Sequence, residues 1–249
     1  MRSLERIGIV VQARLGSSRL PGKALINVEG KPLLRRLCQR MGLCRRADDL
    51  VVATSDQPQD QAIEDACRAW GVPVWRGPEK DLTARLLGAA RKRGLGALVR
   101  VTGDNPLTDP EGIDKMIGAF REDRAKPEIV HNVHRNGYPY GTGAEIASRS
   151  LLEICDRELE SEDEREGFMS FGRQQAKRFK CVKLDAPPRL LRPEYFLTVD
   201  YPEDVALQKE IFAHFGGRDD MRLEEIVAFL DANPQLPKLN SHLHRQFSE

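Results

Sequence analysis

The chain has 249 residues, of which 40% are hydrophobic and 31% are charged, a composition that excludes an intrinsically disordered protein. Its 39 basic and 38 acidic residues leave a formal net charge of +1, so we expect no nucleic-acid partner. Since no segment approaches the roughly 18 consecutive apolar residues of a membrane span and no signal peptide follows Met1, we expect a cytoplasmic protein with no membrane partner.

Apolar runs of strand length alternate with stretches of helical period through residues 1–125. In chain order, the expected elements are a strand at Ile7–Val11, a helix at Leu33–Leu43, a strand at Leu50–Thr54, a helix at Gln59–Trp70, a strand at Val72–Trp75, a helix at Leu82–Arg93, a strand at Leu98–Thr102 and a helix at Glu111–Arg121. An N-cap at Asp109 and a helix-starting proline at Pro110 precede the last of these. This β–α alternation predicts an α/β fold whose parallel sheet carries helices on both faces.

The pattern is less regular after residue 125. The expected elements are a strand at Ile129–Val133, a turn-rich segment at Asn136–Gly143, a helical stretch from Arg149 to about Lys177, strands at Phe179–Leu184 and Tyr195–Val199, and helices at Pro202–Phe215 and Leu223–Leu230. Because no internal repeat and no low-complexity linker interrupts the chain, we expect residues 1–249 to form a single domain with an inserted or appended sub-region.

The loop directly after the first expected strand is rich in glycine and cations. Gln12–Lys23 contains Arg14, Arg19 and Lys23, and three cations can neutralise a triphosphate while glycines let the backbone wrap it. It is not a Walker A loop, because five residues separate its two glycines and an alanine follows the lysine. The first fifty residues carry 11 Lys/Arg against 4 Asp/Glu, which favours a polyanionic ligand over an ordinary solvated loop.

Two aspartates follow expected strands at the carboxyl edge of the sheet, where ligands bind in doubly wound folds. These are Asp104 and Asp200; each could instead cap a turn, which is the role expected for Glu203 and Asp204 in the next helix. Mg²⁺ takes one or two carboxylates together with substrate phosphates. The two aspartates and the cationic loop therefore predict a Mg²⁺–nucleotide site.

The segment Val11–Lys23 resembles the nucleotide-binding signature of the sugar cytidylyltransferases, which include CMP-Kdo synthetase, acylneuraminate cytidylyltransferase and the spore coat polysaccharide biosynthesis type. Further segments occur in the family's order, at Val51–Asp56, Arg100–Leu107, Tyr138–Glu145, Glu164–Glu166 and Leu197–Asp204. The resemblance implies a Rossmann-like, doubly wound, mixed and mostly parallel sheet of the nucleotide-diphospho-sugar transferase kind, with CTP as donor, Mg²⁺ as cofactor and commonly a homodimer. Residues 1–125 would form the nucleotide-binding half and residues 126–200 the acceptor-binding sub-region.

The resemblance also implies roles for individual residues. The expected contacts of the nucleotide are Ala13, Arg14, Gly16, Ser17, Arg19, Lys23, Thr54, Ser55, Asp56 and Arg100. Asp104 and Asp200 match the family's magnesium-binding carboxylates, and with Arg19 and Lys23 they form the expected catalytic set. Tyr138 and Glu145 would face the acceptor, as would Arg100.

Three positions in the acceptor half depart from the family pattern. Tyr140 stands where relatives usually have arginine, Gly143 where they have aspartate, and Gly167 where a histidine follows the Glu-Arg-Glu triplet. The nucleotide half is intact, so CTP chemistry is better supported than any particular sugar.

The implied activity is a CTP-dependent cytidylyltransferase that converts an acidic or modified sugar into its CMP derivative, releasing pyrophosphate, for surface polysaccharide or glycoconjugate synthesis. Lys23 and Arg19 would stabilise the developing pyrophosphate, while Asp104 and Asp200 would hold Mg²⁺. Alternatives are the same transfer to a phosphonate or alditol phosphate, a catalytically weak nucleotide-binding scaffold, and a metal-dependent glycosyltransferase. Intact Lys23, Asp104 and Asp200 disfavour the scaffold, and the cationic loop disfavours the glycosyltransferase.

Other conspicuous residues are expected to be structural. His131 and His134 are three apart in an expected strand, so their side chains would point to opposite faces and form no metal pair. His242 and His244 lie in a polar tail and are expected in solvent. The five cysteines have no CxxC spacing, which disfavours a disulfide framework and a zinc site.

Overall fold

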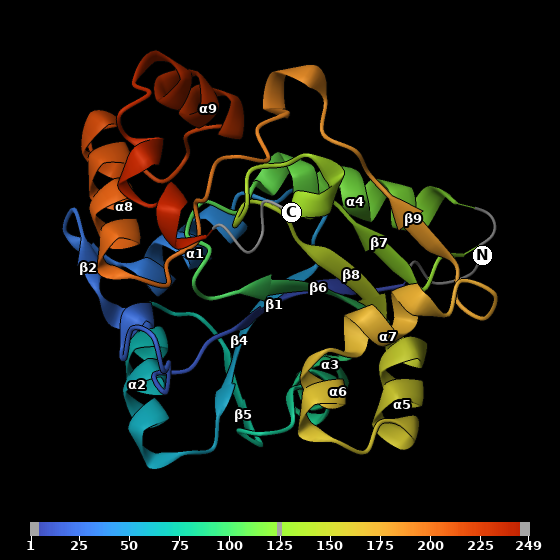
Figure 1. Ribbon diagram of the computed structural model, residues 1–249. Helices are drawn as coiled ribbons and strands as arrows, with labels where there is room; N and C mark the ends of the chain where they lie inside the picture. The colour runs from blue at the N-terminus through green and yellow to red at the C-terminus, as the bar shows by residue number, and fades with distance from the viewer. Residues whose placement is uncertain (1–4, 124–125, 245–249) are drawn as a thin grey trace.

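A seven-stranded sheet organises the computed structural model, which describes residues 5–123 and 126–244 (Figure 1). Its strands stand in the order β5 (Val74–Gly77), β4 (Asp49–Ser55), β1 (Ile7–Gln12), β6 (Ala97–Thr102), β8 (Glu145–Ser148), β7 (Ile129–His131) and β9 (Cys181–Lys183). The pairs β5–β4, β4–β1, β1–β6 and β7–β9 are parallel, whereas β8 is antiparallel to both β6 and β7. The predicted mixed, mostly parallel α/β sheet is therefore confirmed. A separate antiparallel pair joins β2 (Asn27–Val28) to β3 (Lys31–Pro32).

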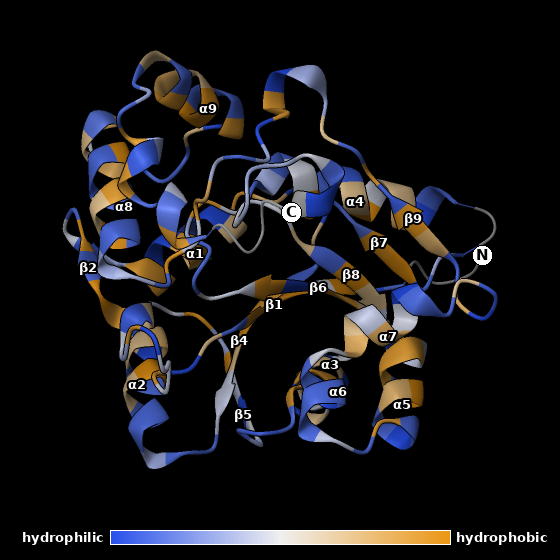
Figure 2. Cartoon of the chain, viewed as in Figure 1, coloured by the Kyte–Doolittle hydropathy of each residue, from blue (hydrophilic) through white to orange (hydrophobic). Residues whose placement is uncertain are grey.

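Helices cover both faces of this sheet. One face packs against α1 (Leu33–Met41), α2 (Gln61–Ala69) and α4 (Pro110–Glu122), and the other against α3 (Leu82–Arg93), α5 (Arg149–Glu158) and α7 (Phe168–Gln174). Successive side chains of β1 alternate between these cores, with Ile9 and Val11 on the first face and Val10 on the second. Figure 2 shows the resulting run of hydrophobic residues along β1 and β6 at the centre of the sheet.

A third hydrophobic cluster lies beside the sheet and joins α8 (Pro202–His214) to α9 (Leu223–Ala232). Short 3₁₀ helices, including one at Lys23–Leu25, and the five-residue α6 (Glu162–Glu166) complete the elements that concern the site. Within the described ranges, no helix combines the length and the apolar character needed to cross a membrane.

The first half follows the predicted order because its local signals agree with its packing. Asp109 caps α4 by accepting hydrogen bonds from the backbone N–H groups of Glu111 and Gly112, and Gly94 ends α3 in the left-handed conformation. The strand predicted at Val72–Trp75 is displaced, because β5 begins at Val74 and its Trp75 pairs with a residue of β4.

The second half contains two corrections. The stretch predicted to be helical from Arg149 to about Lys177 is helical but interrupted: α5, α6 and α7 are separate helices, and α6 ends at Glu166. The strand β8 at Glu145–Ser148 was not predicted, because it has four residues, all buried, and therefore shows no polar–apolar alternation.

The strand predicted at Tyr195–Val199 is also wrong. This segment forms one isolated bridge, between Tyr140 and Phe196, and its backbone bonds to loops instead of to a strand of the sheet. The N–H of Leu197 donates to the carbonyl of Tyr140, and the N–H of Val199 donates to the carbonyl of Asp104 over 2.9 Å. Asp200 consequently follows an extended segment that is hydrogen-bonded to the loops containing Tyr140 and Asp104.

Candidate active site

The cationic loop after β1 turns back on itself before it reaches Lys23. The N–H of Gly22 donates to the carbonyl of Leu15 over 3.0 Å, and Gly22 takes a positive φ of 73° as the chain enters the 3₁₀ helix that begins at Lys23. Asp60 anchors the loop from the other side, because its carboxylate accepts the N–H of Leu15 at 2.7 Å. The fold of the loop thus directs Lys23 back toward the end of β6.

Lys23 lies between the two predicted aspartates. Its Nζ is 2.7 Å from Oδ2 of Asp104 and 2.7 Å from Oδ1 of Asp200, and the Nη2 of Arg19 lies 2.9 Å from the same oxygen of Asp200. The side chain of Asp200 is 5% exposed and that of Asp104 is 25% exposed. Two carboxylates from segments about a hundred residues apart therefore converge on the ammonium group of Lys23, and Arg19 adds a second cation at Asp200.

Gly103 brings the Asp104 loop against the start of the cationic loop. Its N–H donates to the carbonyl of Gln12 over 2.7 Å, and a Cβ at this position would lie 2.8 Å from the Cβ of Ala13. Any larger residue would push the loops apart. The bond from Val199 to the carbonyl of Asp104 then completes the contact between the loops that carry Lys23, Asp104 and Asp200.

A cavity of about 230 Å³ opens beside these groups. Six of the predicted residues line it, namely Ala13, Arg14, Ser17, Arg19, Lys23 and Asp104. Asp200 borders it through its salt bridges to Arg19 and Lys23. A larger groove of about 900 Å³ lies between α4 and the end of α1, but charges of both signs are mixed along it and the converging carboxylates lie elsewhere.

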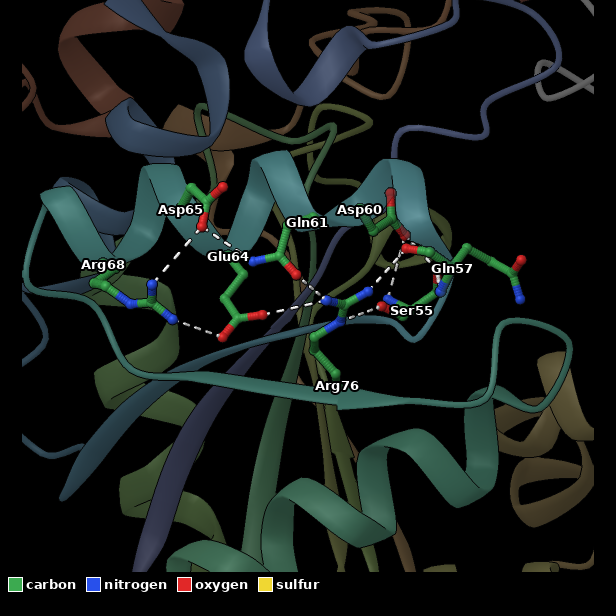
Figure 3. Close-up of polar contacts among 8 residues, drawn as sticks. All are labelled: Ser55, Gln57, Asp60, Gln61, Glu64, Asp65, Arg68 and Arg76. Carbon is green, nitrogen blue, oxygen red and sulfur yellow. Dashed lines mark hydrogen bonds and ion pairs between the residues drawn. The ribbon is translucent and has the colours of Figure 1, made fainter.

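The predicted contacts Thr54 and Ser55 are fully buried at the end of β4 and do not line the cavity. Figure 3 shows that the Ser55 hydroxyl donates to Asp60, while Arg76 donates to the Ser55 carbonyl over 3.1 Å. Since Asp60 also accepts the N–H of Leu15, it connects the end of β4 to the cationic loop. Asp56 and Gly16 are exposed, and neither lines the cavity.

Arg85 and Glu166 also line the cavity. Glu166 belongs to the Glu164–Glu166 segment that matches the family pattern, whereas Arg85 was not predicted. Arg85 is 3% exposed and donates through Nη1 to the carbonyls of Pro78 and Glu79. Burial lowers the pKa of Arg85, against the opposing effect of the Glu166 carboxylate. An arginine at a helical spacing of three from Leu82 interrupts the buried face of α3, and that interruption is the signal by which it could have been found.

In the region predicted to bind the acceptor, titratable residues occupy neighbouring positions across four strands. Arg100 of β6 pairs with Glu145 of β8, Glu145 pairs with His131 of β7, and His131 pairs with Lys183 of β9. Directly paired residues share a face of the sheet, so these four side chains form one row. Burial and the charge of Arg173, which reaches the row from α7, lower the pKa of His131. The prediction that His131 and His134 form no metal pair stays a prediction, because the side chain of His134 lies outside the part of the structure that is described.

Two arginines share the carboxylate of Glu145. Arg100 donates from Nη1 to Oε2 at 2.9 Å, and Arg173 forms an ion pair with Oε1. The Nε of Arg100 also donates to the Gln12 side chain at 2.9 Å, and Gln12 lines the cavity. The cluster therefore carries more positive than negative charge and is linked to the cavity through Gln12.

The two tyrosines of the acceptor region have different surroundings. Tyr138 is 5% exposed and packs with Leu190 and Val227, and it does not line the cavity. Burial raises the pKa of Tyr140, and the charges of Asp104 and Asp200 raise it further.

The structure also bears on Gly143, on the two histidines near the end of the chain and on Asp204. The backbone at Gly143 leaves no room for the aspartate of related sequences, because a Cβ would lie 2.3 Å from the carbonyl oxygen of Asn132. The prediction that His244 lies in solvent is wrong, since it is fully buried against Asp204, whereas His242 is exposed as expected. Asp204 accepts the N–H of Tyr201 at the start of α8, which confirms its capping role.

The comparisons with known proteins agree with this geometry. A family model described as cytidylyltransferase matches residues 8–229. The chain is 31% identical to an uncharacterized protein of Methanocaldococcus jannaschii over 95% of each chain, and 32% identical to the spore coat polysaccharide biosynthesis protein SpsF of Bacillus subtilis over 90% of this chain and 94% of that one. The solved structure of a cytidylyltransferase from Leptospira borgpetersenii superposes with a TM-score of 0.88 at 28% identity, covering 93% of this chain and 96% of the other.

Proposed function

The chain belongs to the cytidylyltransferase family, and from this we propose that it transfers the cytidylyl group of CTP to an acidic or modified sugar and releases pyrophosphate. In this reaction the acceptor hydroxyl oxygen bonds to the α-phosphorus while the bond from that phosphorus to the β-phosphate oxygen breaks. The relative SpsF is named for spore coat polysaccharide biosynthesis, which supports a role in making surface polysaccharide or glycoconjugate.

The observation that carries the proposal is the position of Lys23 between Asp104 and Asp200 at the edge of a cavity lined by Arg14 and Arg19. Phosphoryl-type transfer needs in-line positioning and neutralisation of phosphate charge, with little covalent work by the protein. Arg14, Arg19 and Lys23 supply three cations for a triphosphate. Lys23 and Arg19 would stabilise the charge that develops on pyrophosphate.

The residues present fit a divalent cation such as Mg²⁺. Asp104 and Asp200 direct carboxylate oxygens at a point that a cationic group already occupies, which shows that the pair accommodates positive charge. The described residues contain no cluster of three or more His, Cys, Asp or Glu able to hold a metal, and Mg²⁺ needs only one or two carboxylates beside substrate phosphates. When bound, the ion would polarise the phosphate and lower the pKa of a coordinated hydroxyl.

The acceptor proposal rests on the cluster of Arg100, Glu145 and Arg173. Two arginines on one glutamate leave an uncompensated cation next to the nucleotide cavity, which suits a carboxylate or phosphate on the acceptor. Arg173→Met is expected to raise the acceptor KM about tenfold to a hundredfold and to leave CTP affinity unchanged. Arg178→Met is the matched control, because Arg178 pairs with Glu158 on the surface of the same region.

The function is tested by calorimetric titration of the protein with CTP, ATP, GTP and UTP, each with and without Mg²⁺. We expect a clear preference for CTP that weakens without the metal or in Asp104→Asn. A panel of acidic sugars, phosphonates and alditol phosphates, assayed by pyrophosphate release, then identifies the acceptor class. Equal or absent binding of all four nucleotides would overturn the proposal. The homodimer that the family resemblance implies is tested separately by sedimentation of the full chain.

A further inference from the structure

Asp204 holds the backbone on which Asp200 sits. It lies in the first turn of α8 and is fully buried, and its Oδ2 accepts the N–H of Asp200 at 2.7 Å and the N–H of Tyr201 at 2.8 Å. These two bonds fix the backbone of Asp200, so the position of the Asp200 carboxylate depends on the position of a second carboxylate behind it.

The last described segment of the chain holds Asp204 in turn. The Nδ2 of Asn240 donates to Oδ1 of Asp204 at 2.7 Å, and the Nε2 of His244 lies 3.0 Å from the same oxygen. A carboxylate can only accept, so the His244 ring donates. Hydrogen bonds from His244, Asn240 and the backbone outweigh the opposing effect of burial and lower the pKa of Asp204. Both tail residues are fully buried.

The same tail residues also hold the extended segment before Asp200. Asn240 donates from Nδ2 to the carbonyl of Phe196 at 2.8 Å, and the His244 ring stacks on the Phe196 ring with a centroid distance of 4.9 Å and an interplanar angle of 12°. His244 also meets the Tyr201 ring edge-on at 5.8 Å. Since the segment from Tyr195 to Val199 lacks a strand partner in the sheet, the tail supplies part of the restraint that a sheet would provide.

We propose that Asn240 and His244 are positioning residues, which hold Asp200 in place through Asp204 and Phe196 so that Asp200 and Asp104 converge. Neither residue lines the cavity. The inference about convergence rests on the proposed function, but the restraint on the Asp200 backbone can be measured independently of it.

The direct test is hydrogen exchange by mass spectrometry on the full chain without nucleotide. In His244→Ala we expect amides of the peptide spanning residues 197–204 to exchange about tenfold faster or more, because a bond to a charged group is lost. His244→Gln retains an Nε2–H donor and is expected to restore most of the protection. His242→Ala is the matched control, since His242 lies in the same segment but is exposed.

Kinetics provide the second readout. In His244→Ala and Asn240→Ala the Mg²⁺ concentration for half-maximal pyrophosphate release should rise about tenfold, with CTP binding in the absence of metal unchanged. Wild-type exchange and wild-type Mg²⁺ dependence in both variants would overturn the inference. A second outcome would also overturn it: His244→Ala loses activity, His244→Gln does not restore that activity, and the Mg²⁺ dependence stays unchanged. That result would assign His244 a purely structural role.

The two proposals fail in different ways. If His244→Ala does not fold, His244→Gln and Asn240→Ala carry the exchange measurement. A wild-type protein that binds no CTP refutes the proposed function, while the exchange result still decides whether the tail restrains Asp200.

Discussion

Replacing Lys23 by methionine removes the one cation shared by Asp104 and Asp200 and keeps a side chain of similar length. We expect two separable consequences. The protein without nucleotide loses stability, because two carboxylates are left facing each other, and pyrophosphate release falls, because the phosphates lose a cation.

The size of the first effect follows from the distances. Both carboxylate oxygens lie 2.7 Å from the Lys23 Nζ, so they are at most twice that distance apart. Two unit charges about 5 Å apart repel by roughly 3 kcal/mol at an effective dielectric constant of about 20. The partial exposure of Asp104 and the second cation on Asp200, Arg19, reduce this, so we expect a destabilisation of about 2 kcal/mol.

The assay is urea unfolding in the presence of a chelator, with Lys209→Met as a control because Lys209 is exposed on α8. The double variant Lys23→Met/Asp104→Asn removes the repulsion and should regain most of the lost stability without regaining activity. For the catalytic effect we expect a loss of about 10²–10³ in turnover, measured by pyrophosphate release. The reasoning is refuted if Lys23→Met unfolds at the wild-type urea concentration, or if the double variant is no more stable than the single one.

Further predictions follow from the other charged and thiol groups. Asp104→Asn should reduce pyrophosphate release by about 10²–10³ and leave the circular dichroism spectrum unchanged, so near-normal turnover would remove Asp104 from the site. Hydrogen bonds from Arg192 hold the pKa of Asp231 below its usual range, so Asp231 contributes stability above the unfolded pKa and loses it as the pH falls through the folded one. The gap in unfolding free energy between wild type and Asp231→Asn should therefore be about 0.5–1 kcal/mol at pH 7 and diminish as the pH falls below about 3.9, the ordinary aspartate pKa. Burial raises the pKa of Cys67 to about 12 and of Cys155 to about 11, so both should resist a thiol reagent at pH 8 until the protein is unfolded; rapid reaction of the native protein would contradict this.

The first half of the fold was predictable because its signals are local. Buried β-branched runs such as Ile7–Val11 identify a central strand. The start of α4 is indicated by its N-cap residue Asp109 and by Pro110 at its first position. The second half was harder because β8 is four residues long and α6 has no buried residue. The structure of the second half is determined by long-range packing, which cannot be predicted from the sequence of one segment alone.

The site divides in the same way. The sequence indicates Lys23, Asp104 and Asp200 by residue type and position, and the structure brings the three together. For Asp200 the premise was wrong, since no strand precedes it, but loops hold its segment at the same edge. The contacts of Arg173 and His244 could not be predicted, because each residue reaches the site from a helix or tail distant in the sequence. Nothing in the local sequence pattern there distinguishes a buried contact from a solvated charge.

If Asp104 and Asp200 hold a metal ion as proposed, the double salt bridge of Lys23 would make metal binding and nucleotide binding interdependent. One ammonium group cannot neutralise the two carboxylates and a triphosphate at full strength at once. A triphosphate that draws on Lys23 leaves Asp104 and Asp200 more negative, which strengthens their affinity for a divalent cation, and by thermodynamic reciprocity the cation strengthens triphosphate binding by the same factor. We therefore expect metal and nucleotide to bind cooperatively, each weakly alone and tightly as a pair.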